Sequence, residues 1–342
     1  MKLITFAVPC YNSQSYMKTC IDSLLIGGED VEILIINDGS SDQTGSIAEE
    51  YQSAYPTIVR AVHQENGGHG AGVNKGLQLA NGLYYKVVDS DDCLDPAALY
   101  ALLKVLKQHL SAGISVDLYI TNFVYNHTED QTNYVCHFRK QFPSAEIIGW
   151  ENVKPMYLWH MLLMHALVYR TELLRKAGTL LPEHTCYVDN LFAYQPLPYV
   201  KKLFYLDRDL YLYSIGRADQ SVSIQNMVER YAQQIKVMSL MLSSHSYEQI
   251  HRQIRPLQKQ MYHFLHSVML NTYFFTTQKD EPERRSRLNR LWKDLQVRDP
   301  RLYHKMRRMP LILFVNCLSW KWKGRVSLWS YRILARHVKL GA

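Results

Sequence analysis

The feature that most limits the fold of this chain is the alternation of short apolar runs with helical segments over residues 1–88. The apolar runs lie at residues 3–8, 31–36, 57–63 and 84–88. Helices are expected at residues 15–25, at 44–55 and from the glycine-rich segment to residue 80. Strands and helices that alternate at this spacing form a parallel sheet with right-handed crossovers. The sequence therefore predicts an α/β fold with a mostly parallel sheet and flanking helices.

The fourth apolar run ends in three carboxylates, Asp89, Asp91 and Asp92. Open α/β sheets bind their ligands at the carboxyl ends of the strands. Carboxylates two residues apart can share one hard divalent cation, which phosphate oxygens and water then complete. The alternative is that Asp91, Asp92, Asp95 and Pro96 form a turn and a helix cap. The first interpretation predicts a site for a metal and a diphosphate.

Two more loops should reach the same edge of the sheet, because they follow the first and second strands at residues 9–12 and 37–42. A glycine-rich segment follows the third strand at residues 65–72. In chain order, the segments PCYN, NDGSSD, ENGGHGAGVNKG and VDSDD resemble family 2 glycosyltransferases of the GT-A fold. The resemblance is close over residues 1–100 and extends to about residue 225. It implies a Rossmann-like GT-A sheet, a nucleotide-sugar donor, Mn²⁺ or Mg²⁺, and inversion at the anomeric carbon.

The resemblance also implies roles for individual residues. Those implied in binding the nucleotide or the sugar are Pro9, Tyr11, Asn12, Asp38, Asn66, Gly67, Gly70, Asp89, Asp92 and Arg217. The loop at 9–12 would line the nucleotide pocket, Asp38 would hydrogen-bond the base or ribose, and the glycines would lie along nucleotide and sugar. Asp89 and Asp91 would form the DxD pair that holds the metal, with Asp91 as the more direct ligand. A bound cation would neutralise the charge that develops on the leaving diphosphate.

An inverting transfer needs a base that takes the proton of the acceptor hydroxyl. By the resemblance this base is Asp189, although Val188 stands where the family usually carries Glu. The alternative is that Asp189 caps a helix at residues 190–194. Farther along, Arg217 lies in a glycine-containing loop that resembles a segment able to close over the donor diphosphate; the alternative is a polar surface loop.

Three histidines lie within the thirty residues before Asp189. His160 and His165 fall in an apolar stretch that is expected to be an amphipathic helix, where a histidine is typically a hydrogen-bonded packing residue. His184 lies five residues before Asp189 and receives no role.

The last part of the chain carries the positive charge. The net charge is +8, yet residues 301–342 hold ten Lys or Arg and no Asp or Glu, so residues 1–300 sum to −2. Helices are expected at residues 231–243, 247–276 and 283–295, and residues 310–323 interleave apolar residues, tryptophans and lysines. This pattern is typical of a helix at a membrane interface. The alternative is a basic helix packed on the catalytic domain, and nucleic acid is not expected, because the body is acidic and lacks a recognition motif.

Composition indicates the compartment and the division of the chain. Six scattered cysteines argue against a zinc site or disulfides and favour a reducing cytosol. No apolar stretch is long enough to span a membrane, and residues 3–8 are too short for a signal peptide. We expect a cytoplasmic protein that contacts the inner face of the cell membrane. Its predicted parts are a catalytic domain at 1–225, with a nucleotide-binding half at 1–100 and an acceptor half at 101–225, and a basic helical extension at 226–342.

The predicted function is an inverting glycosyltransferase of cell-envelope polysaccharide biosynthesis. UDP is the expected nucleotide, and the acceptor would be a glycan, a lipid-linked sugar or a surface polymer. Residues 70–76 spell GxGxxxG, which would suit an NAD(P)-dependent oxidoreductase, but this fingerprint normally follows the first strand rather than the third. A nucleotidyltransferase would need a glycine-rich basic loop after the first strand, which PCYN does not provide. A catalytically silent binding module is supported only by Val188.

Overall fold

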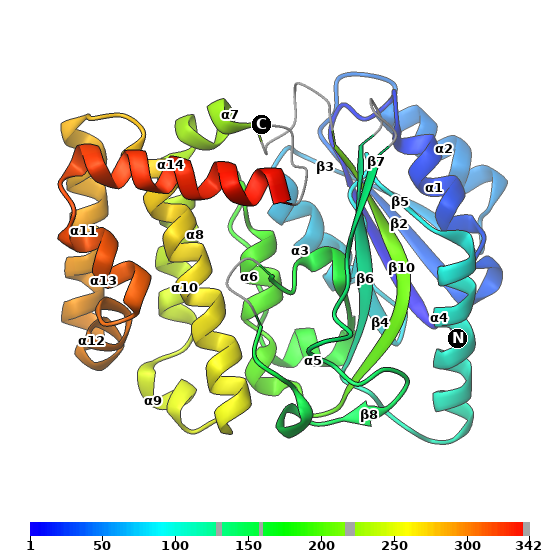
Figure 1. Ribbon diagram of the computed structural model, residues 1–342. Helices are drawn as coiled ribbons and strands as arrows, with labels where there is room; N and C mark the ends of the chain where they lie inside the picture. Colours follow the sequence, from blue (N-terminus) through cyan, green and yellow to red (C-terminus); the bar gives the residue numbers. More distant parts are fainter. Residues whose placement is uncertain (128–131, 157–159, 216–222, 338–342) are drawn as a thin grey trace. The chain divides into compact units, whose positions relative to one another are not determined.

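The computed structural model describes residues 1–127, 132–156, 160–215 and 223–337, with side chains described as far as residue 333. The chain divides into two compact units (Figure 1). Unit 1 comprises Met1–Lys154 and Leu162–Ser214, and unit 2 comprises Pro155–Met161 and Ile215–Ala342. The predicted boundaries at residues 100 and 225 stay predictions.

Unit 1 is built on one sheet with the strand order β3-β2-β1-β4-β9-β6-β10-β5, to which β7 and β8 add at β6 and β10. The parallel strands are β1 (Ile4–Cys10), β2 (Val31–Asp38), β3 (Val59–Gln64) and β4 (Tyr84–Val87). The helices that follow them are α1 (Met17–Leu25), α2 (Thr44–Ala54) and α3 (His69–Leu79), joined later by α4 (Pro96–Ser111), α5 (Thr171–Lys176) and α6 (Asp189–Tyr194). In Figure 1, α1, α2 and α4 lie on one side of the sheet and α3 and α6 on the other. The predicted α/β fold is confirmed.

The parallel half follows from the apolar runs. Every residue of β1 is buried, as expected for a strand that lies between two neighbours, β2 and β4. Glycines let α3 approach β1 closely, because a Cβ on Gly72 would lie 2.9 Å from the Cβ of Pro9, and one on Gly76 would lie 2.6 Å from the Cβ of Ala7. Two glycines of the GxGxxxG segment therefore serve helix–sheet packing.

The second half of the sheet contains the antiparallel strand pairs and corrects one prediction. Its strands are β5 (Cys93–Leu94), β6 (Leu118–His127), β7 (Thr132–Cys136), β8 (Ile147–Ile148), β9 (Leu167–Arg170) and β10 (Leu203–Ile215). The amphipathic helix expected around His165 is wrong: Met164–Ala166 form one 3-10 turn, and β9 follows, pairing with β4 and β6. An apolar run of this length suits a helix or a buried strand equally, so only its pairing partners decide. His160 lies outside this turn, next to residues that are not described.

Unit 2 is helical in its described part. Its helices are α7 (Ile224–Glu229), α8 (Tyr231–Ser244), α9 (Tyr247–His251), α10 (Arg255–Thr277), α11 (Pro282–Arg298), α12 (Pro300–Arg307), α13 (Pro310–Cys317) and α14 (Trp320–His337). The helix expected at 247–276 is interrupted, because Ile254 is extended and a new helix begins at Arg255, with Pro256 in its first turn. Among the described residues, none of the helices combines the length and the apolar character that crossing a membrane requires.

Candidate active site

The loops after β1 and β2 are tied together where these strands end. The backbone N–H of Asn12 donates to Ser40 Oγ at 3.0 Å, and Asn12 Oδ1 accepts from the N–H of Ser41 at 2.9 Å. Asn12 has a φ of +49°, which Asn tolerates better than most residues. Tyr11 beside it is exposed, whereas Pro9 is buried under α3. Of the predicted nucleotide-pocket residues in this loop, Tyr11 and Asn12 thus face solvent.

Asp38, at the end of β2, anchors the glycine-rich loop. Its carboxylate is buried and accepts hydrogen bonds from the backbone N–H groups of Gly67 at 2.9 Å and Gly68 at 2.7 Å. Gln64 Nε2 donates to the same carboxylate at 2.7 Å, and Asn66 Nδ2 donates to the backbone oxygen of Asp38 at 2.9 Å. The sequence did not predict this anchoring role, and the predicted contact of Asp38 with the base or ribose stays a prediction.

The same glycines receive a distant segment of the chain. A Cβ on Gly70 would lie 2.6 Å from the backbone oxygen of Pro182, and a Cβ on Gly68, whose φ is +81°, would lie 3.2 Å from His184. The backbone N–H of His184 donates to the oxygen of Gly67 at 2.7 Å. The glycine loop therefore positions the segment that leads to Asp189.

The acidic loop after β4 begins with an ion pair. His69, the first residue of α3, approaches Asp89 with 2.8 Å between Nε2 and Oδ1. Burial alone would lower the pKa of His69, but the neighbouring Asp89 carboxylate raises it overall. Burial would likewise raise the pKa of Asp89, and the charge and hydrogen bond of His69 lower it instead. Both groups are thus held in their charged forms by each other.

Asp92 points into the protein and is held by β10. Tyr211 Oη donates to Asp92 Oδ2 at 2.6 Å, and the N–H of Ser214 donates to Oδ1 at 2.8 Å. The same tyrosine oxygen accepts from the N–H of Asp89 at 3.1 Å. Burial raises the pKa of Asp92, and the charges of Asp91 and Asp89 raise it further. A bound cation would offset this repulsion and favour the ionised form of Asp92.

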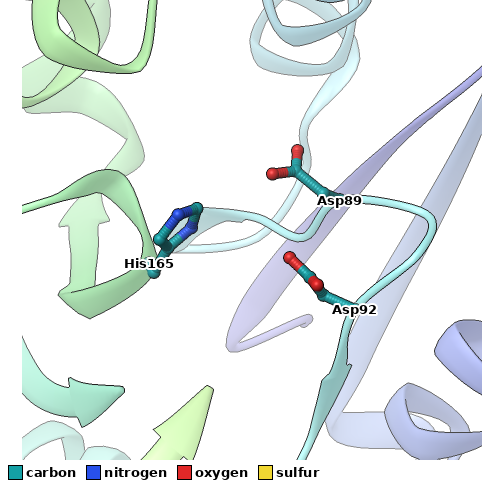
Figure 2. Close-up of side chains that lie close together, drawn as sticks. All are labelled: Asp89, Asp92 and His165. Carbon is teal, nitrogen blue, oxygen red and sulfur yellow. The ribbon is translucent and has the colours of Figure 1, made fainter. Parts of the chain in front are cut away.

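A histidine from the turn just before β9 completes the group. One donor atom each of Asp89, Asp92 and His165 lies within 4.8 Å of the others, and Figure 2 shows the three side chains around one space. His165 Nδ1 is buried and has no hydrogen-bond partner among the described residues, and burial lowers the pKa of this imidazole to about 4. A neutral imidazole with a free buried nitrogen, beside two carboxylates, suits a divalent cation. The side chains present therefore fit the metal that the acidic loop predicts.

A buried lysine hydrogen-bonds the backbone of His165. Lys86, in β4, is fully buried, and its Nζ donates to the backbone oxygen of His165 at 2.6 Å. His165 in turn packs its ring against Tyr211, with 4.6 Å between centroids. Burial lowers the pKa of Lys86 to about 7, so that much of its population is uncharged near neutral pH.

Asp189 is the first residue of α6. The N-cap is Val188, whose side chain is buried and caps nothing, so the alternative that Asp189 caps this helix is wrong. Burial raises the pKa of Asp189 from 3.8 to about 6. The charge of His69 lowers this pKa in part, and the charge of Asp89 raises it. Asp189 is therefore close enough to the His69–Asp89 pair to respond to its charge, and its pKa suits a general base near neutral pH.

Comparison with known proteins agrees with this architecture. Residues 5–172 match the model of glycosyl transferase family 2. The chain carries a family 2 glycosyltransferase domain. Over 224 residues it is 31% identical to the uncharacterized glycosyltransferase EpsJ of Bacillus subtilis (strain 168), a match that covers 62% of this chain and 60% of EpsJ. The chain thus spans less than two thirds of the length of this relative.

Two solved structures share the fold. S. aureus TarS 1–349 in complex with UDP-GlcNAc is 19% identical with a TM-score of 0.66, covering 97% of this chain and 92% of that one. The mannosyltransferase PcManGT from Pyrobaculum calidifontis, in complex with GDP-Man and Mn²⁺, is 14% identical with a TM-score of 0.50, covering 96% and 87%. Both likenesses place the chain in the predicted GT-A fold class.

Three more residues named from the sequence have separate outcomes. Asp95 accepts from the N–H of Ala98 at 2.8 Å and caps α4, so the cap alternative is correct for this residue. Asp91 is half-buried beside Asp92, and its role as a metal ligand stays a prediction. Arg217 lies outside the described residues. The sequence analysis did not assign His69 or His165 to the site. The position of His69 inside the glycine-rich segment could have indicated its role.

Proposed function

We propose that this chain is an inverting glycosyltransferase that moves a sugar from a UDP-sugar to a glycan, a lipid-linked acceptor or a cell-surface polymer. The observation that supports this most is a carboxyl group with a pKa of about 6, Asp189, within electrostatic reach of the ion pair of His69 and Asp89. A carboxylate of this basicity beside a cation-binding cluster suits the transfer of an acceptor proton and the departure of a diphosphate.

In this reaction Asp189 accepts the proton of the acceptor hydroxyl. The freed oxygen attacks the anomeric carbon from the face opposite the diphosphate, and the bond between that carbon and the diphosphate oxygen breaks. Its electron pair leaves with the UDP, so the sugar arrives with inverted configuration. The glycine loop, anchored by Asp38, holds the segment before Asp189 in position for this step.

A divalent cation, Mn²⁺ or Mg²⁺, would supply positive charge at the leaving diphosphate. Asp89, Asp92 and His165 offer two oxygens and a nitrogen for it, and Asp91 is the ligand that the family pattern favours. The nitrogen favours Mn²⁺, because imidazole binds transition metals better than it binds Mg²⁺. The presence of Mn²⁺ in the PcManGT complex is consistent with this choice.

The choice of UDP rests on TarS, a fold relative whose structure holds UDP-GlcNAc. We assign catalysis to residues 1–225 and propose that the basic helical extension at 226–342 holds the enzyme at the inner face of the cell membrane, where lipid-linked acceptors reside. This arrangement would serve polysaccharide biosynthesis.

The test is multiple-turnover release of UDP from a panel of UDP-sugars, with and without lipid-linked and oligosaccharide acceptors. The proposal expects turnover with one sugar and an inverted anomeric proton signal in the product by NMR. Binding of UDP-sugars without turnover would favour the silent binding module, and binding of NAD(P)H in place of UDP would contradict the proposal.

A further inference from the structure

Helix α14 packs on its own unit through two small residues, Gly324 and Ser327, and through the aromatic rings of Trp320 and Tyr331. A Cβ on Gly324 would lie 2.4 Å from the backbone oxygen of Thr277, so the two helices α10 and α14 are as close there as glycine permits. Gln278 Nε2 donates to Ser327 Oγ at 3.1 Å, and Tyr331 stacks on Phe274 of α10 with 4.5 Å between ring centroids. These contacts fix which side of α14 faces the protein.

The opposite side carries three exposed apolar side chains. Trp322, Trp329 and Ile333 are 54%, 65% and 47% exposed. At about 100° per residue, these three positions fall within about 40° of one another around the helix. Positions 324, 327 and 331 fall about 140–200° from Trp322 on the same wheel, which agrees with their contacts to α10 and its C-terminal cap. We call Trp322, Trp329 and Ile333 the tryptophan stripe.

The outer side of α14 is more apolar than that of an ordinary surface helix. A helix on a water-soluble protein buries its apolar side and exposes its polar one. Here Ser327 and Gly324 face the protein, whereas two indole rings, among the largest apolar side chains, face outward. Such a face is stable when a partner removes it from water.

The charges beside the tryptophan stripe identify the kind of partner. Lys321, Arg325 and Arg332 fall within about 40° of one another on one flank of the stripe, and all three are exposed. The guanidinium of Arg325 lies over the ring of Trp322 at 5.2 Å. No Asp or Glu occurs from residue 301 to the end of the chain. Indole rings with neighbouring cations match the headgroup layer of an anionic bilayer.

We propose that the tryptophan stripe of α14 is the docking surface of this protein for an anionic lipid bilayer, with Trp322 and Trp329 at the headgroup level and the flanking cations on lipid phosphates. This proposal rests on the proposed membrane attachment of the C-terminal extension and names the face that makes it. The helix lies along the membrane, because its other side is occupied by α10.

The test uses the full chain in cosedimentation with phosphatidylcholine vesicles that contain about 30% phosphatidylglycerol or none, because the cations require anionic lipid. The wild type should bind the anionic vesicles and should bind the neutral ones at least about tenfold more weakly. Replacement of both tryptophans, Trp322→Ser with Trp329→Ser, should weaken binding to the anionic vesicles by at least about tenfold. The matched control is Tyr100→Ser, which removes a 71% exposed aromatic ring from α4 of unit 1 and should bind as the wild type does.

Thermal unfolding of each variant excludes a loss of fold as the cause. Equal binding of the wild type and the double variant would overturn the proposal. So would a concentration-dependent dimer that the double variant abolishes while vesicles bind neither protein, because the stripe would then contact a second copy. Release of UDP from a UDP-sugar without vesicles separates the two proposals: it reports on sugar transfer chemistry whether or not the chain binds lipid.

Discussion

The pH dependence of sugar transfer tests the role of Asp189 quantitatively. With a pKa of about 6, this carboxyl group is about nine-tenths ionised at pH 7 and about one-tenth ionised at pH 5. If Asp189 is the base, kcat/KM should fall about tenfold between these pH values. A carboxyl group at the ordinary value of 3.8 would lose less than about a tenth of its ionised form over the same range.

The assay is the initial rate of UDP release at low donor concentration between pH 4.5 and 8. Asp189→Asn should lower kcat/KM by about 10²–10⁴-fold and should remove the inflection near pH 6. The matched control is Asp95→Asn, which keeps a good helix cap on α4 and should leave the inflection in place. A profile of the wild type that stays flat down to pH 5, or an inflection that survives in Asp189→Asn, would refute the assignment.

Stability separates loss of the base from loss of the fold. Because the pKa of Asp189 is higher in the folded protein than the usual 3.8, the folded state binds more protons, and its stability falls as pH rises from 3.8 to about 6. At pH 7 the ionised carboxylate therefore costs no more than about 3 kcal/mol, and less to the extent that water reaches this half-buried group. Asp189→Asn should thus lose most of its activity yet be at least as stable as the wild type at pH 7, as measured by urea unfolding.

Three further substitutions test the parts that support the site. Gly70→Ala places a methyl group against the backbone oxygen of Pro182 and should cost about 1–3 kcal/mol of stability by urea unfolding, together with a slower transfer rate. Asp38→Asn sets an amide NH₂ against a backbone N–H of the glycine loop and should cost about 1–3 kcal/mol, which a stability equal to the wild type would contradict. Between pH 7 and 10, Lys86 binds fewer protons in the folded protein than in the unfolded chain. It therefore makes the free energy of unfolding rise with pH, by up to about 1.4 kcal/mol per pH unit. Lys86→Met should lose this pH dependence, and an unchanged dependence would contradict the low pKa of Lys86.

The parallel half of the sheet could be predicted because its information is local. Each strand is a short apolar run, each loop carries turn residues, and four motifs occur in family order within residues 1–92. The strands at 31–36 and 84–88 are found in the structure within one or two residues at each end.

The partners of the acidic loop could not be predicted, because they come from distant parts of the chain. Tyr211 and Ser214 bind Asp92 across more than one hundred residues of sequence. His165 reaches the same place only because β9 pairs with β4, and its apolar surroundings were typical of a helix as much as of a strand. Asp38 has the residue type expected of a ligand contact, but its hydrogen bonds to the glycine loop depend on the folded backbone.

The most direct test of the central claim, a metal-assisted nucleotide-sugar site at the end of β4, is calorimetric binding of UDP, GDP and NAD, each with and without Mn²⁺, to the wild type and to Asp91→Ala. The account predicts that UDP binds in a manganese-dependent way and that the substitution abolishes this dependence. Binding of NAD instead, or binding of UDP that neither manganese nor Asp91 affects, would contradict it.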